Sequence, residues 1–95
     1  MLTSKQRSEL RAMANEIQPI FQIGKQGITE ETVASLCEAL EARELIKITV
    51  LKNADVSAKD IINEVAEMTG AEPVSAIGSK IVLYKPSKKH PKIVL

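Results

Sequence analysis

The stretch of this chain best suited to bind a ligand is a four-residue turn: Gly24, Lys25, Gln26 and Gly27. It lies between an apolar run that ends at Ile23 and a predicted helix start at Thr29. Backbone amides converge at such a strand-to-helix turn, and the positive end of the helix dipole favours anions there. The two glycines permit left-handed backbone angles and close approach of a ligand, while Lys25 adds a positive charge. The turn therefore predicts a phosphate-binding loop.

Two glycines at this spacing are also common in ordinary strand-to-helix turns, and spacing alone does not separate the two interpretations. The loop lacks the longer spacing and the final Lys-Ser/Thr of a P-loop, and it is not the three-glycine dinucleotide pattern. A nucleotide cofactor is therefore not indicated, and we expect none.

The remaining reactive side chains do not indicate catalysis or metal binding. The one histidine, His90, lies in a Pro-containing C-terminal segment, and the one cysteine, Cys37, lies in an apolar helical stripe that predicts a buried structural thiol. Metal sites need several clustered ligands, and nucleophilic catalysis needs a base beside the nucleophile. Four glutamates fit solvated helix faces better than a cation site: Glu38, Glu41, Glu64 and Glu67. We expect neither an enzyme nor a metal protein.

Acidic and basic side chains are segregated along the chain, although the net charge is only +1. Residues 29–72 carry four basic side chains and ten acidic ones, whereas residues 73–95 carry five lysines and no acid. This distribution predicts a basic face for a polyanion and an acidic face turned elsewhere. No apolar run approaches the roughly 18 residues of a membrane span, and residues 1–20 lack an apolar signal core. We expect a cytoplasmic protein without membrane contact.

Periodicity and capping signals predict helices and strands in the order α-β-α-β-α-β-β. Thr29 and Ser57 can accept hydrogen bonds from first-turn amides, and Gly70 is a natural left-handed helix stop. The pair at residues 78–79, Gly-Ser, suits a II′ hairpin turn. We expect helices at residues 4–16, from 29 onward and between 57 and 70, and strands at 20–23, 45–52, 74–77 and 80–85. Together they predict an α/β fold, a single domain with a mixed four-stranded sheet packed with helices.

This topology is expected to bring cations from distant parts of the chain to the glycine loop. The connection at residues 17–19 is so short that we expect the first helix to run antiparallel to the first strand and to begin near the loop. If strands one to three are parallel, their C-terminal ends share that edge of the sheet. The cations expected beside the loop are then Lys5, Arg7, Arg11, Lys52 and Lys80.

Cations distributed along one edge of a domain are better suited to bind the sugar-phosphate backbone of a nucleic acid than a small ligand. Phe21 and Tyr84 are the only aromatic residues, so there is no row of rings on which successive bases could stack. We expect recognition of structured RNA through its shape and phosphates.

Three segments in combination resemble the CRM domain in its stand-alone bacterial YhbY-type form. They are PIFQIGKQGITEE at residues 19–31, ALEARELIKI at residues 39–48 and IGSKIVLYKPS at residues 77–87. The resemblance implies a fold similar to the C-terminal domain of translation initiation factor three and RNA binding through the loop at residues 24–27. It also implies association with precursors of the large ribosomal subunit.

The leading hypothesis is therefore a monomeric assembly factor that binds large-subunit ribosomal RNA without covalent chemistry. Residues 1–87 are expected to form the RNA-binding domain, and residues 88–95 a basic C-terminal tail of uncertain order. A second hypothesis is a protein-interaction module whose acidic helices, within residues 29–72, dock onto a basic partner such as a ribosomal protein.

Overall fold

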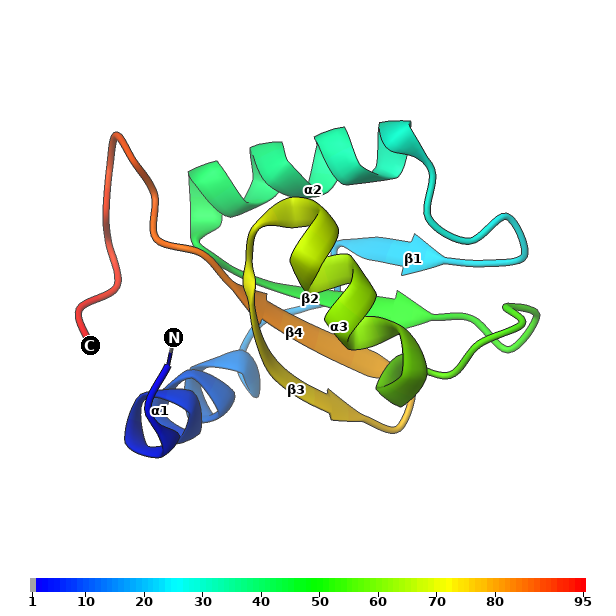
Figure 1. Ribbon diagram of the computed structural model, residues 1–95. Coiled ribbons are helices and arrows are strands. Elements are labelled where there is room, and N and C mark those ends of the chain that lie inside the picture. Colours follow the sequence, from blue (N-terminus) through cyan, green and yellow to red (C-terminus); the bar gives the residue numbers. More distant parts are fainter. Residues whose placement is uncertain (1) are drawn as a thin grey trace.

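The computed structural model describes residues 2–95 and contains the expected elements in the expected order (Figure 1). The helices are α1 (Ser4–Ala14), α2 (Glu30–Arg43) and α3 (Ala58–Thr69). The strands are β1 (Phe21–Ile23), β2 (Leu45–Val50), β3 (Glu72–Ile77) and β4 (Lys80–Tyr84). The α/β class and the element order predicted from the sequence are confirmed.

The four strands form one mixed sheet in the order β1-β2-β4-β3. Strands β1 and β2 pair in parallel, and β4 runs antiparallel to both of its neighbours, β2 and β3. Strands β1, β2 and β3 therefore point the same way and end at one edge of the sheet. The β3–β4 turn lies at this edge too, since the Val50 amide donates to the Ser79 carbonyl at 2.7 Å.

The helix boundaries follow from local capping. The Thr29 hydroxyl accepts a hydrogen bond from the Thr32 amide (3.1 Å), and the Ser57 hydroxyl accepts one from the Asp60 amide (3.2 Å). Each bond satisfies an amide that has no partner within the helix. Gly70 ends α3 with a φ of 73°, in the left-handed region that glycine adopts without strain.

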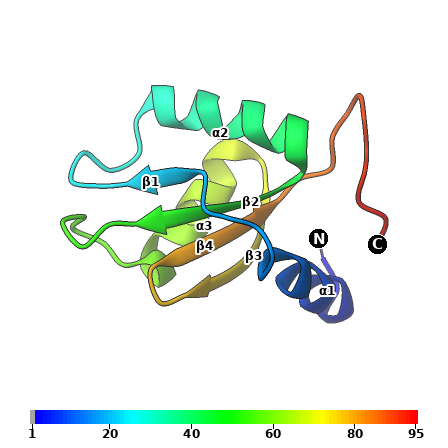
Figure 2. The ribbon, with the colours of Figure 1, turned by 180° about the vertical axis from the view of Figure 1, so that it is seen from behind.

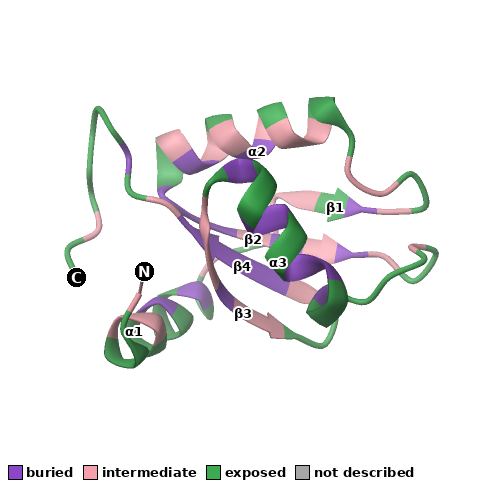
Figure 3. Ribbon diagram, in the orientation of Figure 1, coloured by how far each residue is buried: buried purple, intermediate pink, exposed green. Residues whose placement is uncertain are grey.

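The helices cover the two faces of the sheet unequally (Figures 1 and 2). Helices α2 and α3 share one face and bury the main core, which includes Leu36, Ile48 and Val65. Helix α1 packs on the other face, where Leu10 and Ala14 join a smaller core. Purple segments in Figure 3 mark the buried residues along α3, β2 and β4 between these layers.

The orientation of α1 differs from the sequence-based expectation. It crosses the face formed by β3, β4 and β2 instead of running antiparallel along β1. Its start lies at the end of the molecule away from the β1–α2 loop (Figures 1 and 2). The expectation that Lys5 and Arg7 lie beside the loop is therefore wrong. The crossing angle follows from packing, because Leu10 and Ala14 must contact apolar residues that come from several strands: Leu45, Val74, Val82 and Tyr84.

The C-terminal segment is bonded to the end of α2 by two carboxylates. Glu44, which is fully buried, accepts hydrogen bonds from the backbone amides of Ser87 (2.9 Å), Lys92 and Ile93 (2.8 Å). Burial by itself would raise the pKa of this carboxyl, but the three amides and the Lys92 charge hold its pKa below the ordinary value. Glu44 also adopts a φ of 66°, which is strained for a residue with a side chain.

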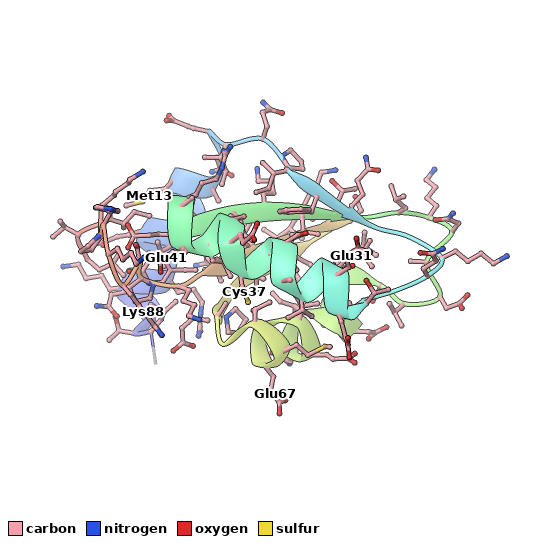
Figure 4. The ribbon with its side chains drawn as sticks, turned by 90° about the horizontal axis from the view of Figure 1, so that it is seen from above. Met13, Glu31, Cys37, Glu41, Glu67 and Lys88 are labelled. Carbon is pink, nitrogen blue, oxygen red and sulfur yellow. The ribbon has the colours of Figure 1, made fainter. Side chains whose placement is uncertain are left out.

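Glu41, one turn earlier, holds the adjoining part of the same segment. It accepts bonds from the Ser87 hydroxyl and from the amides of Lys88 and Lys89, and these lower its pKa from 4.5 to about 2. Figure 4 shows Glu41 beside the chain that carries Lys88. The interpretation of Glu41 as part of a solvated helix face is therefore wrong. Residues 87–93 are fastened to the fold through their backbone.

Candidate nucleic-acid interface

The glycine loop is a tight turn at the edge where the parallel strands end. The Gly27 amide donates to the Gly24 carbonyl at 3.0 Å, and Gly27 has a φ of 71°, whereas Gly24 has no left-handed φ. Lys25 and Gln26, at the tip, are exposed. One of the loop amides is thus already bonded within the turn, and an anion would contact the exposed tip.

A hollow of about 490 Å³ lies between this loop and the first turn of α2. Lys25 is the one cation among its lining residues, and Glu31 is the one acid. Figure 4 shows Glu31 at the end of α2 that leads to the loop. Glu30 and Glu31 offset part of the attraction that the helix dipole would exert on a phosphate. Among the described residues that line this hollow, Lys25 alone offers a positive side chain to an anion.

Lys52 lies at the same end of the molecule, in the loop between β2 and α3. The Leu51 amide donates to the Ile23 carbonyl at 2.8 Å, which binds the start of this loop to the end of β1. A Cβ atom added at Gly24 would lie 3.4 Å from the Leu51 side chain and 3.5 Å from that of Asn53. Figure 1 shows the two loops projecting side by side. The predicted proximity of Lys52 to the glycine loop is therefore present.

Arg11 and Lys80 lie together on the α1 side of the sheet, and Lys80 is at the predicted edge, paired with Thr49 and Ile77 near the ends of β2 and β3. They line one hollow with Lys47, a residue that was not among the predicted site residues. The Lys80 ammonium donates to the Thr49 hydroxyl at 3.1 Å, which holds the charge on this face. The sequence could have indicated Lys47, because alternate residues of a strand face opposite sides of the sheet. Ile46 and Ile48 face the main core, so Lys47 faces away from it.

Arg7 lines a further hollow beside β3, together with Lys59 of α3. Among residues 2–95, no acid lines this hollow or the one that holds Arg11 and Lys80. Lys5, in the first turn of α1, belongs to the same end of that helix as Arg7. The predicted cations thus divide into a loop end with Lys25 and Lys52 and a basic face around α1 with Arg7, Arg11 and Lys80.

The side chains considered for catalysis lie in separate environments. Cys37 is half-buried on α2, and its thiol donates to the Thr69 carbonyl at 3.8 Å. His90 belongs to the fastened C-terminal segment, where its amide donates to the Ser87 hydroxyl. Within residues 2–95, no three His, Cys or carboxylate side chains gather as metal ligands would. None of the helices in this part of the chain has the length and apolar character needed to cross a membrane.

The domain thus combines a four-stranded mixed sheet, two helices on one face and a glycine turn between β1 and α2. Residues 2–85 match the family model described as the CRS1 / YhbY (CRM) domain, and the chain belongs to this family. It is 43% identical over 95 residues to the Bacillus subtilis protein named "Probable RNA-binding protein YqeI", covering 100% of this chain and 99% of that one.

Two further proteins are similar over most of their length. A Haemophilus influenzae protein named "RNA-binding protein" is 38% identical over 89 residues, which cover 93% of this chain and 89% of the relative. The solution structure of the hypothetical protein SAV1595 from Staphylococcus aureus is 46% identical, with a TM-score of 0.83. It covers 100% of this chain and 99% of that one. The sequence-based recognition of the family is confirmed.

Proposed function

We propose that this protein binds RNA by holding its sugar-phosphate backbone at the loop end. The observation that carries the proposal is the exposed glycine turn, with Lys25 at its tip and Lys52 on the adjoining loop. Phosphates are contacted in RNA complexes by lysine side chains and by backbone amides of this kind. RNA as the ligand is supported by the relatives, which carry RNA-binding names and align with nearly the whole chain.

The RNA in this proposal is that of the large ribosomal subunit or its precursor, and the protein acts as an assembly factor in the cytoplasm. It acts by binding alone, without covalent chemistry or a cofactor. A basic face with Arg7, Arg11 and Lys80 extends the contact beyond the loop. A net charge of +1 limits non-specific attraction to RNA and so favours docking on one shaped site.

Binding of the unlabelled full chain to fragments of large-subunit ribosomal RNA tests this proposal. The variant Lys25→Ala/Lys52→Ala removes both loop-end charges, and Lys88→Ala/Lys89→Ala removes two exposed charges from the C-terminal segment as a matched control. Each lost phosphate contact is expected to weaken binding about three- to tenfold, of the order of 1 kcal/mol. The loop variant should lose about ten- to a hundredfold in affinity and the control much less. Equal losses would refute a specific role for the loop end.

A second candidate function is docking onto a basic protein through the exposed acids of α2 and α3. The supporting observation is that Glu38, Glu64 and Glu67 are exposed on helices that cover the face of the sheet opposite to α1. Co-sedimentation with ribosomes after charge reversal at Lys25, Arg7 and Lys80 separates the candidates. If the charge-reversed variant still sediments with ribosomes, protein docking is favoured. If it no longer sediments with them, RNA binding is favoured.

A further inference from the structure

Helix α1 leaves part of its face of the sheet uncovered. The buried contacts of α1 reach Val82 of β4. Closer to the edge where β1, β2 and β3 end, one residue from each strand lies in a row of neighbouring pairs: Gln22, Thr49, Lys80 and Ile77. Ile77, in this row, is 69% exposed. A hollow of about 430 Å³ lies where α1 meets this uncovered row. Its volume is within the range of small-molecule sites, about 300–1,000 Å³.

Positive charge surrounds the hollow. Arg11 of α1, Lys47 of β2 and Lys80 of β4 line it, and the lining contains no acid from the part of the chain that the structure describes. The Lys80 ammonium donates a hydrogen bond to the neutral hydroxyl of Thr49, and this bond does not neutralise its charge. The neighbouring hollow shares Ser75 and adds Arg7 and Lys59. Such a group of cations attracts a phosphate, and a guanidinium can bind one with two parallel hydrogen bonds.

The hollow also offers what a nucleobase requires. Its apolar lining includes Ala14 and Val82, both nearly fully buried, and the exposed Ile77. Asn15 and Ser75 line the same hollow, and their side chains carry an amide and a hydroxyl, which can hydrogen-bond to the edge of a base. A base in a double helix has neither a free face nor a free Watson–Crick edge, whereas an unpaired base has both.

We propose that this hollow binds one unpaired nucleotide of the RNA. Its phosphate lies against Arg11, Lys47 and Lys80, and its base packs on Val82 and Ile77. This inference rests on the proposed RNA binding and adds a requirement that the loop end does not impose: a single-stranded position, such as a bulge, next to the backbone that the glycine loop holds.

The test is an amide-resolved NMR titration of the ¹⁵N-labelled full chain with two RNA hairpins that differ by a single-nucleotide bulge. The expected result is a shift of the amides at residues 75–82 and of Asn15 with the bulged hairpin, and little shift there with the perfect hairpin. Amides at residues 24–27 should shift with both. If the perfect hairpin moves residues 75–82 equally, the hollow is only a phosphate site and the nucleotide proposal is wrong.

Matched variants give a second readout. Ile77→Ser should lower affinity for the bulged hairpin by about three- to tenfold, as expected for loss of an apolar contact with a base, and leave the perfect hairpin unaffected. Met68→Ser, at another exposed apolar residue (46%), is the control and should change neither. Unchanged binding of the bulged hairpin by Ile77→Ser would overturn the nucleotide site while leaving RNA binding intact. Absence of binding to both hairpins, with no shift at residues 24–27, would instead overturn the proposed function.

Discussion

The carboxylate of Glu44 gives the sharpest prediction about stability. It is fully buried, and it accepts three backbone amides from the C-terminal segment, those of Ser87, Lys92 and Ile93. The variant Glu44→Ala removes the acceptor and leaves these amides without their partner. A buried amide that loses its partner costs about 1–3 kcal/mol.

The three amides are not equally protected, and this sets the expected magnitude. The bond to Ser87 is buried, whereas those to Lys92 and Ile93 are partly buried and their amides can recruit water. We therefore expect Glu44→Ala to lower the free energy of unfolding by about 2–4 kcal/mol, out of the roughly 5–15 kcal/mol typical of a domain. Glu44→Gly loses the same acceptor but relieves the strained φ of 66°, so it should be about 1 kcal/mol more stable than Glu44→Ala.

Urea unfolding at pH 7, followed by circular dichroism, measures these differences. Glu38→Ala, at an exposed glutamate on the same helix, is the control and should change the unfolding free energy by less than about 0.5 kcal/mol. Hydrogen exchange should also show faster exchange of the amides at residues 87–93 in Glu44→Ala. If Glu44→Ala is as stable as Glu38→Ala, the carboxylate of Glu44 contributes nothing to holding the C-terminal segment.

Two further predictions concern pH and the glycine loop. Because the folded pKa values of Glu41 and Glu44 lie below the ordinary value of 4.5, their charged forms stabilise the fold above about pH 4.5. This stabilisation is lost below that pH, in the case of Glu41 as the pH falls toward about 2. The unfolding free energy of the wild type should therefore fall more steeply with decreasing pH than that of Glu41→Gln/Glu44→Gln, and parallel curves would show that the bonds to these carboxylates do not stabilise the fold. Gly27→Ala should lower the free energy of unfolding, measured in urea, by about 1 kcal/mol, because Gly27 has a φ of 71°. Gly24→Ala should unfold nearly as the wild type does, because Gly24 has no left-handed φ. A larger loss for Gly24→Ala than for Gly27→Ala would contradict this turn conformation.

Helix boundaries were predictable where a capping residue determines them, whereas α1 ends at Ala14, two residues before its predicted end at residue 16. Thr29, Ser57 and Gly70 act at the positions where capping rules put them, because a cap involves only residues within one helical turn. Strand β3 starts at Glu72, two residues before its predicted start at Val74. Proline cannot donate to a central ladder, but β3 is an edge strand and accommodates Pro73.

Features that depend on tertiary packing were not predictable. A short connection fixes which elements are neighbours but not the angle at which α1 crosses the sheet, so Arg7 lies beside α3 and β3 instead of at the glycine loop. The role of Glu44 depends on amides more than 40 positions away in the chain. The sequence held one indication that Glu44 has a structural role. An acid at the C-terminal end of a helix interacts unfavourably with the helix dipole, and Glu44 occupies that position without a glycine after it.

The salt dependence of binding shows whether the loop end neutralises RNA phosphates. Each neutralised phosphate contributes about 0.7–0.9 to the slope of log affinity against log salt concentration, so four to six contacts give a slope of about −3 to −5. Lys25→Ala/Lys52→Ala should flatten the wild-type slope by about 1.5, and Lys88→Ala/Lys89→Ala should leave it nearly unchanged. A wild-type slope near zero, or a slope that the loop variant does not alter, would show that the loop end does not neutralise RNA phosphates.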